Sequence, residues 1–127
     1  MKRLLVVGAL AMIALSACQK EQQSWVIFGK PNNKNYDESY SYQPSSIQKV
    51  QTKSGDTVKV MSISIMDNKT KEIRYRRWHV MENDCTVGYG KVFATEVDGS
   101  TWVNTYDFAS KSGSVVSDGA DALCDNN

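Results

Sequence analysis

The stretch TVKVMSISIMDNKTKEIRYRRWHVM, residues 57–81, shows the period of two that is typical of β-strands. Its first half is rich in β-branched residues, and residues 67–70 (Asp-Asn-Lys-Thr) have the composition of a turn. We therefore predict a β-hairpin formed by residues 57–66 and 71–81. The apolar side chains change from even to odd positions at Met61, which indicates either that both faces of the strand are covered or that a bulge shifts its phase.

The same period continues on both sides of this hairpin. Short strands are expected at residues 25–28 and 36–42, and residues 54–56 (Ser-Gly-Asp) form a turn. After the hairpin, a one-sided apolar stripe predicts a strand that contains Cys85, Val87, Tyr89, Phe93 and Val97. A turn at residues 98–100 (Asp-Gly-Ser) then leads into a last strand with Trp102, Tyr106 and Phe108 on one face.

The C-terminal stretch changes to helical spacing. Its apolar residues fall on one side of a helix that Ser114 would cap: Val115 or Val116, Ala120, Leu123 and Cys124. Gly119 weakens such a helix by about 1 kcal/mol relative to Ala. The sequence thus predicts a mainly β fold of the α+β class, with a single antiparallel sheet of about six strands and a short C-terminal helix.

The first 17 residues have the pattern of a secretory signal peptide. Lys2 and Arg3 precede an apolar run at residues 4–15, which small residues follow. The run is too short to span a bilayer, which needs about 20 residues. Residues 15–18 (Leu-Ser-Ala-Cys) resemble the bacterial lipobox, so we expect cleavage before Cys18 and lipid on that cysteine. The alternative is an ordinary signal peptide followed by a chance cysteine.

This resemblance implies three parts: a signal peptide (1–17), a lipidated tether (18–24) and one domain (25–127). Two or more acyl chains hold a protein stably on a membrane. Gln19 follows the cysteine instead of Asp, which favours the outer membrane and leaves open which side of it the domain faces.

Cys85 and Cys124 are the cysteines that remain once Cys18 carries lipid. In an oxidising compartment these two can pair in only one way, and the bond would pin the C-terminal helix to the strand that contains Cys85. Closing a loop of this length stabilises a fold by roughly 4 kcal/mol. The alternative is two buried free thiols.

Charge and composition narrow the classes of function. Without Lys2 and Arg3 the chain keeps 13 of its 15 basic residues against 14 acidic ones, which argues against nucleic acid as a partner. His79 is the single histidine, and a catalytic Cys–His pair would need a free thiol. No cluster has the spacing of metal ligands. We therefore expect a non-catalytic protein without a cofactor.

Two groups of residues are candidates for partner binding. The basic group contains Lys69, Lys71, Arg74, Arg76 and Arg77. It would contact lipid A phosphates, a sulfated glycan or an acidic protein, or else simply keep a strand soluble. In a strand, Arg74 and Arg76 share one face and Arg77 lies on the other. The second group, Tyr36, Tyr40 and Tyr42, would be binding anchors or core residues of a small sheet.

The order of these features resembles the surface-adhesin protein E family of small Gram-negative lipoproteins. The matching pieces are residues 25–27, 36–47, 56–60, 75–85 and 113–124, with the two-cysteine frame as the most specific element. The family's lysine-rich segment between the cysteines has no counterpart here, where the chain has Lys91 and Lys111.

The resemblance implies an outer-membrane lipoprotein, able to form a homodimer, that acts as an adhesin for host extracellular-matrix or serum proteins. Two other functions stay open from the residues alone. One is a periplasmic inhibitor of a wall hydrolase such as lysozyme, and the other is an accessory lipoprotein of envelope assembly.

Overall fold

The computed structural model describes residues 24–28 and 38–126. Its strands are β1 (Val26–Phe28), β2 (Glu38–Tyr42), β3 (Gln48–Gln51), β4 (Thr57–Asp67), β5 (Ile73–Met81), β6 (Tyr89–Thr95) and β7 (Trp102–Ala109). Its helices are the 3-10 turn η1 (Pro44–Ser46), α2 (Glu82–Val87) and α3 (Val115–Asp125). The expected signal peptide, Cys18 and Tyr36 lie outside the described residues.

All strands belong to one antiparallel sheet with the order β1-β2-β4-β5-β6-β7, which confirms the predicted fold class. β3 also pairs with β4, so that β2 and β3 share one edge of the same long strand. Ser62 lies on β4 between the part that pairs with β2 and the part that pairs with β3. Its N–H donates to Ser46 Oγ at 2.8 Å, and its carbonyl accepts from Gln43 N at 3.3 Å. β3 was not predicted, because its four residues (QKVQ) are all exposed and show no apolar alternation.

The predicted hairpin of β4 and β5 is confirmed, and its register decides between the two explanations of the phase change. The pairing runs without interruption from Val58 opposite Met81 to Met66 opposite Ile73, so no bulge shifts the strand. Instead, β4 carries buried apolar side chains on both faces: Met61 is 1 % exposed on one face and Val60 is 3 % exposed on the other.

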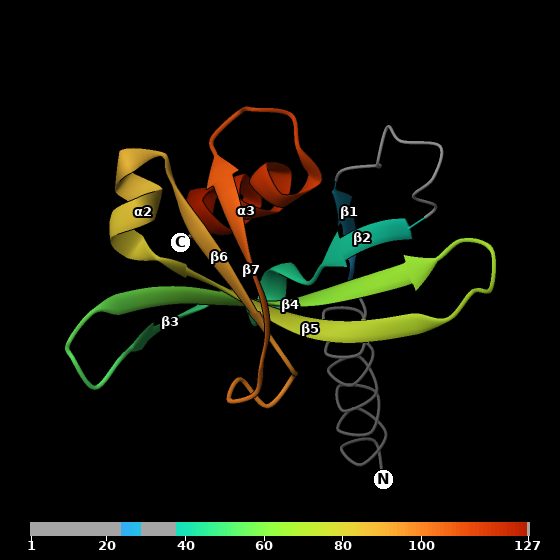
Figure 1. The fold of residues 1–127 in the computed structure, drawn as a ribbon, viewed down its shortest axis with the longest axis horizontal. Coiled ribbons are helices and arrows are strands. Elements are labelled where there is room, and N and C mark those ends of the chain that lie inside the picture. Colours follow the sequence, from blue (N-terminus) through green and yellow to red (C-terminus); the bar gives the residue numbers. More distant parts are fainter. Residues whose placement is uncertain (1–23, 29–37, 127) are drawn as a thin grey trace, which may run out of the picture.

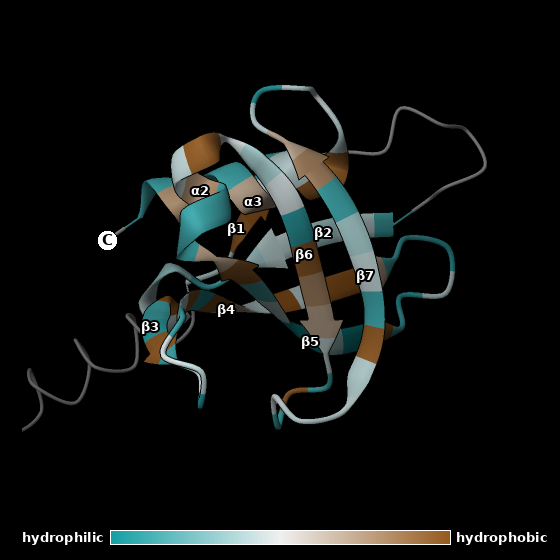
Figure 2. Cartoon of the chain, turned by 60° about the vertical axis from the view of Figure 1, so that its left-hand side comes forward, coloured by the Kyte–Doolittle hydropathy of each residue, from teal (hydrophilic) through white to brown (hydrophobic). Residues whose placement is uncertain are grey.

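The hydrophobic core lies between the sheet and α3. Figure 1 shows α3 between β7 and the β1–β2 pair, and Figure 2 shows hydrophobic segments on several strands and on α2. The buried cluster consists of Phe28, Met61, Ile63, Ile65, Trp78, Val80, Val92, Ala94, Phe108, Ala120 and Leu123. Burying apolar surface of this kind is the main force that stabilises a small domain.

The predicted C-terminal helix is confirmed together with its cap. Ser114 has an extended backbone, and its side chain accepts a hydrogen bond from Ser117 N. Gly119 is buried where α3 meets the sheet, since a Cβ there would come within 2.5 Å of the Trp78 ring. The glycine that weakens the helix therefore lets it pack closely on the core.

The prediction of a strand through Cys85 was wrong. Residues 82–87 form α2, which ends at Gly88 in the left-handed conformation (φ 92°), and the strand begins only at Tyr89. The apolar stripe was misleading because its odd positions within β6 are exposed, at 64 % for Tyr89 and 37 % for Phe93, while Val92 on the opposite face is buried. The disulfide between Cys85 and Cys124 is confirmed, with Cα atoms 5.3 Å apart, and it joins α3 to α2.

Candidate binding site

We call the face of the sheet opposite to α3 the open face. In β5, Trp78 and Val80 point to the core, so the alternate residues Tyr75, Arg77 and His79 point to the open face. Directly paired residues of antiparallel strands share a face, which places Val60 of β4 beside His79.

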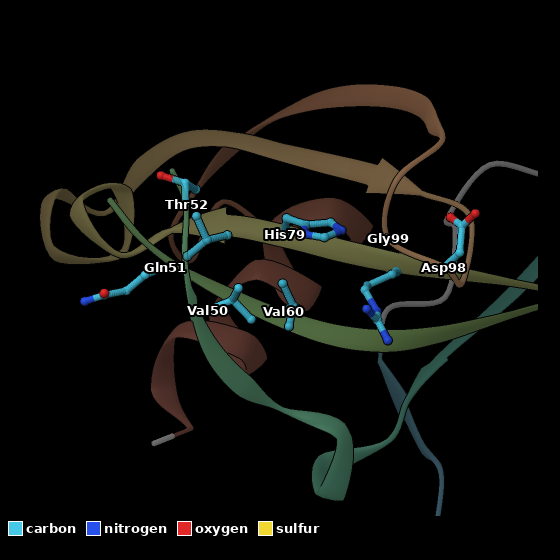
Figure 3. Close-up of a pocket in the computed structure, with 9 residues that line it drawn as sticks. Val50, Gln51, Thr52, Val60, His79, Asp98 and Gly99 are labelled. Atoms are coloured by element: carbon cyan, nitrogen blue, oxygen red, sulfur yellow. The ribbon is translucent and has the colours of Figure 1, made fainter. Parts of the chain in front are cut away.

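A pocket of about 240 Å³ lies on the open face between β3 and the β6–β7 turn. Its apolar lining comes from Val50, Val58 and Val60, and its polar lining includes Arg77, His79 and Asp98. Figure 3 shows His79 over Val50 and Val60, with Asp98 and Gly99 at the far side. We call this cavity the Arg77 pocket.

His79 is held in one protonation state by its neighbours. Its Nε2 lies 2.9 Å from Thr95 Oγ1, and that hydroxyl donates its only hydrogen to the Glu96 carbonyl at 2.9 Å. The geometry fits the tautomer in which Nε2 donates to Thr95 Oγ1 and Nδ1 is an acceptor. Burial lowers the pKa of His79 and the charge of Arg77 lowers it further, so the imidazole is neutral at neutral pH.

One oxygen of the Asp98 carboxylate stabilises the turn that begins at Asp98. Its Oδ1 accepts N–H groups of Ser100 and Thr101 at 3.0 and 3.4 Å. These two hydrogen bonds are the main reason why the pKa of Asp98 is lowered, and the charge of Arg77 adds a smaller effect. The turn also brings Gly99 close to Arg77, since a Cβ at Gly99 would meet Nη1 at 3.0 Å.

The three arginines of β5 have different surroundings. Arg74 forms an ion pair with Glu38 at 2.6 Å, and Arg76 forms one with Glu96 at 3.4 Å. Among residues 24–28 and 38–126, no carboxylate lies within 4.0 Å of the Arg77 guanidinium. The expected division of faces is confirmed, and Arg77 alone of the three lines the pocket.

Tyr40 and Tyr42 lie half-buried on the core side of β2. The Phe28 ring is 6.0 Å from the Tyr40 ring and 5.9 Å from the Tyr42 ring. These contacts support the interpretation of both tyrosines as part of the core. The two exposed lysines of the basic group, Lys69 and Lys71, flank Thr70 beyond the end of β4.

Four exposed apolar side chains lie on the open face of β5 and at or beside β1, and we call them the Trp25 patch: Trp25 (38 % exposed), Ile27 (62 %), Ile73 (50 %) and Tyr75 (50 %). Pairing across β1, β2, β4 and β5 sets Ile27, Ser41, Ser64 and Tyr75 in one row. The rings of Trp25 and Tyr75 are 6.1 Å apart. The sequence did not indicate this patch, because its members come from separate strands that are brought together only by the register.

The described part of the chain has neither a cluster of metal-ligand side chains nor a membrane-spanning helix. It contains no group of three or more His, Cys, Asp or Glu side chains placed to hold a metal ion. None of its helices has the length and apolar character needed to cross a membrane.

No family model, curated protein or solved structure matches this chain. The resemblance to the surface-adhesin protein E family stays a prediction.

Proposed function

We propose that this protein is a cell-envelope lipoprotein that acts without catalysis, by binding a protein partner through the open face of its sheet. In this proposal, lipid on Cys18 holds the domain at the outer membrane. The tether leads into Trp25, so the binding surface begins where the tether ends.

The Trp25 patch is the observation that carries the proposal. Isolated exposed apolar side chains are common on protein surfaces, whereas exposed side chains that pack against each other, as the rings of Trp25 and Tyr75 do, are typical of an interaction site. Two of its four members are aromatic, and Trp and Tyr are the residues most often found among energetic hot spots of interfaces. The serines between them, Ser41 and Ser64, leave hydroxyl groups that can hydrogen-bond to a partner's backbone.

The partner class is a protein, and a host matrix or serum protein is the narrower case that the family resemblance implies. The matched experiment compares the double variant Trp25→Ser/Tyr75→Ser with Val87→Ser. Val87 on α2 is 51 % exposed, like Tyr75, but it lies outside the patch.

Binding to immobilised laminin and vitronectin is measured with the lipoprotein extracted from membranes. We expect the double variant to bind about tenfold or more weakly than the natural protein, since loss of a hot-spot side chain costs 2 kcal/mol or more. Val87→Ser should bind unchanged. If the natural protein binds neither, the matrix partner is wrong; if both variants bind equally well, the patch is not the binding surface.

Protease treatment of intact cells determines which side of the membrane the domain faces. Cleavage of the domain on intact cells supports a partner outside the cell. Full protection until the outer membrane is opened would contradict an adhesin.

A further inference from the structure

The Arg77 pocket combines features that do not serve the fold alone. Val58 and Val60 are 8 % and 3 % exposed, so most of the apolar wall consists of buried side chains of β4, and Val50 of β3 adds an exposed edge. A guanidinium group lies beside this wall with no carboxylate within ion-pair distance among the described residues. Arg74 and Arg76, three residues and one residue earlier on the same strand, both have such a partner.

Two other polar groups of the pocket, His79 and Asp98, already have hydrogen-bond partners within the protein. His79 is fixed by Thr95 through Nε2, so its ring does not donate a second proton while it is neutral. Oδ1 of the Asp98 carboxylate accepts hydrogen bonds from N–H groups of its own turn. Arg77 is therefore the strong donor that remains for a ligand, and a guanidinium fork matches the two oxygens of a carboxylate.

We propose that the Arg77 pocket binds a carboxylate group attached to a small apolar body, with the carboxylate on Arg77 and the apolar part against Val50, Val58 and Val60. The volume of about 240 Å³ fits one side chain or one small acid, not an extended chain. The carboxylate comes either from an acidic side chain of the protein partner, in which case the inference rests on the proposed function, or from a free organic acid.

The single histidine of the chain provides a direct readout, since His79 lines the pocket and gives one set of imidazole NMR signals. The intact lipoprotein in detergent is titrated with 3-phenylpropionate and with its uncharged isostere 3-phenylpropanamide. We expect a saturable shift of the His79 signals with the acid and not with the amide. Equal shifts with both probes, or no saturable shift with either, would overturn the proposal.

Two variants test the role of the arginine. Arg77→Gln should weaken binding of 3-phenylpropionate about tenfold or more, because a hydrogen bond to a charged group contributes about 1.5 to 3 kcal/mol. Arg76→Gln removes an equal charge one residue away, from a side chain that points to the other face, and should leave binding unchanged. An Arg77→Lys variant keeps the charge without the fork and should bind with intermediate affinity. Unaltered affinity in Arg77→Gln, with a spectrum that shows an intact fold, would overturn the assignment.

The source of the carboxylate is found by a third probe, the acetylated tripeptide amide Leu-Glu-Leu. Tighter binding of the peptide than of 3-phenylpropionate identifies a protein segment, and the reverse order identifies a free acid. The Trp25→Ser/Tyr75→Ser variant separates this inference from the proposed function. If that variant still binds matrix proteins while the pocket binds 3-phenylpropionate, only the role of the patch has failed.

Discussion

The backbone of Gly119 lies directly against the ring of Trp78. A Cβ placed on Gly119 would approach Trp78 Cζ3 to 2.5 Å and Phe28 Cε2 to 2.7 Å. This contact seats α3 on the centre of the sheet, so the packing of the whole core depends on a residue without a side chain.

We expect Gly119→Ala to destabilise the protein although alanine is the better helix former. The added methyl group would overpack the core, which costs about 1 to 3 kcal/mol and exceeds the gain of about 1 kcal/mol in helix propensity. Ala122→Gly is the control, because Ala122 is only partly buried and should follow propensity alone. The urea midpoints of the two variants are compared with that of the natural protein. A higher midpoint for Gly119→Ala would show that the contact is not tight.

Lys59 is a buried cation that caps the end of α3. The residue is 4 % exposed, and its Nζ donates to the carbonyl groups of Cys124 and Asn126, each at 2.9 Å. Lys59→Met should lower the free energy of unfolding by about 1 to 3 kcal/mol, because it leaves both carbonyls at the negative end of the helix without this donor.

Lys49→Met is the matched control for Lys59→Met. Lys49 forms an ion pair with Glu82 at 3.2 Å in which both side chains are substantially exposed, so the change should stay within about 0.5 kcal/mol. Chemical denaturation measures both variants. Equal losses would mean that Lys59 acts only as a surface charge.

The Cys85–Cys124 disulfide should be the largest single contribution to stability. It closes a loop with a sequence separation of 39, for which chain entropy gives about 4 kcal/mol. Reduction should lower the urea midpoint of the natural protein and leave the Cys85→Ala/Cys124→Ala variant, which starts lower, unaffected. An unchanged midpoint after complete reduction would contradict this expectation.

The stability of the fold should fall on mild acidification because of His79. Burial lowers its pKa below the ordinary value of 6.5, so below that pH the unfolded chain binds the proton more readily than the folded one. The charged groups near it are Arg77, which opposes protonation, and Asp98 across the pocket. The stabilising effect is complete above the unfolded pKa and is lost as the pH falls through the folded pKa.

His79→Gln keeps a side chain that can donate to Thr95 but removes the titration. Thermal midpoints between about pH 7.5 and about pH 5 should therefore fall more steeply for the natural protein than for the variant. Parallel curves would mean that the imidazole protonates equally well in both states.

Much of the fold could be predicted from the sequence because local patterns determine it. The β4–β5 hairpin, the turns at Gly55 and Gly99, and the helix capped by Ser114 all have signals within a few residues. The failures have a common cause. α2 is a single short helix in an alternating sequence, and β3 is an exposed edge without an apolar face, so neither differs locally from its neighbours.

Less of the candidate site than of the fold could be predicted from the sequence. The arginines of β5 were recognised, but which of them is free of an ion pair depends on Glu38 and Glu96, which lie on other strands or turns. The pocket itself needs Val50 from β3 and Asp98 from the β6–β7 turn. Such a combination follows only from the register and from the course of the turns in space.

The proposed function depends on where the protein is held, and the intact mass of the protein extracted from cell membranes tests this most directly. We predict a chain that begins at Cys18 and carries the mass of a diacylglyceryl group and a further acyl chain on that residue, and a Cys18→Ser variant that no longer fractionates with membranes. A chain that begins elsewhere, or a Cys18 without lipid, would contradict the account.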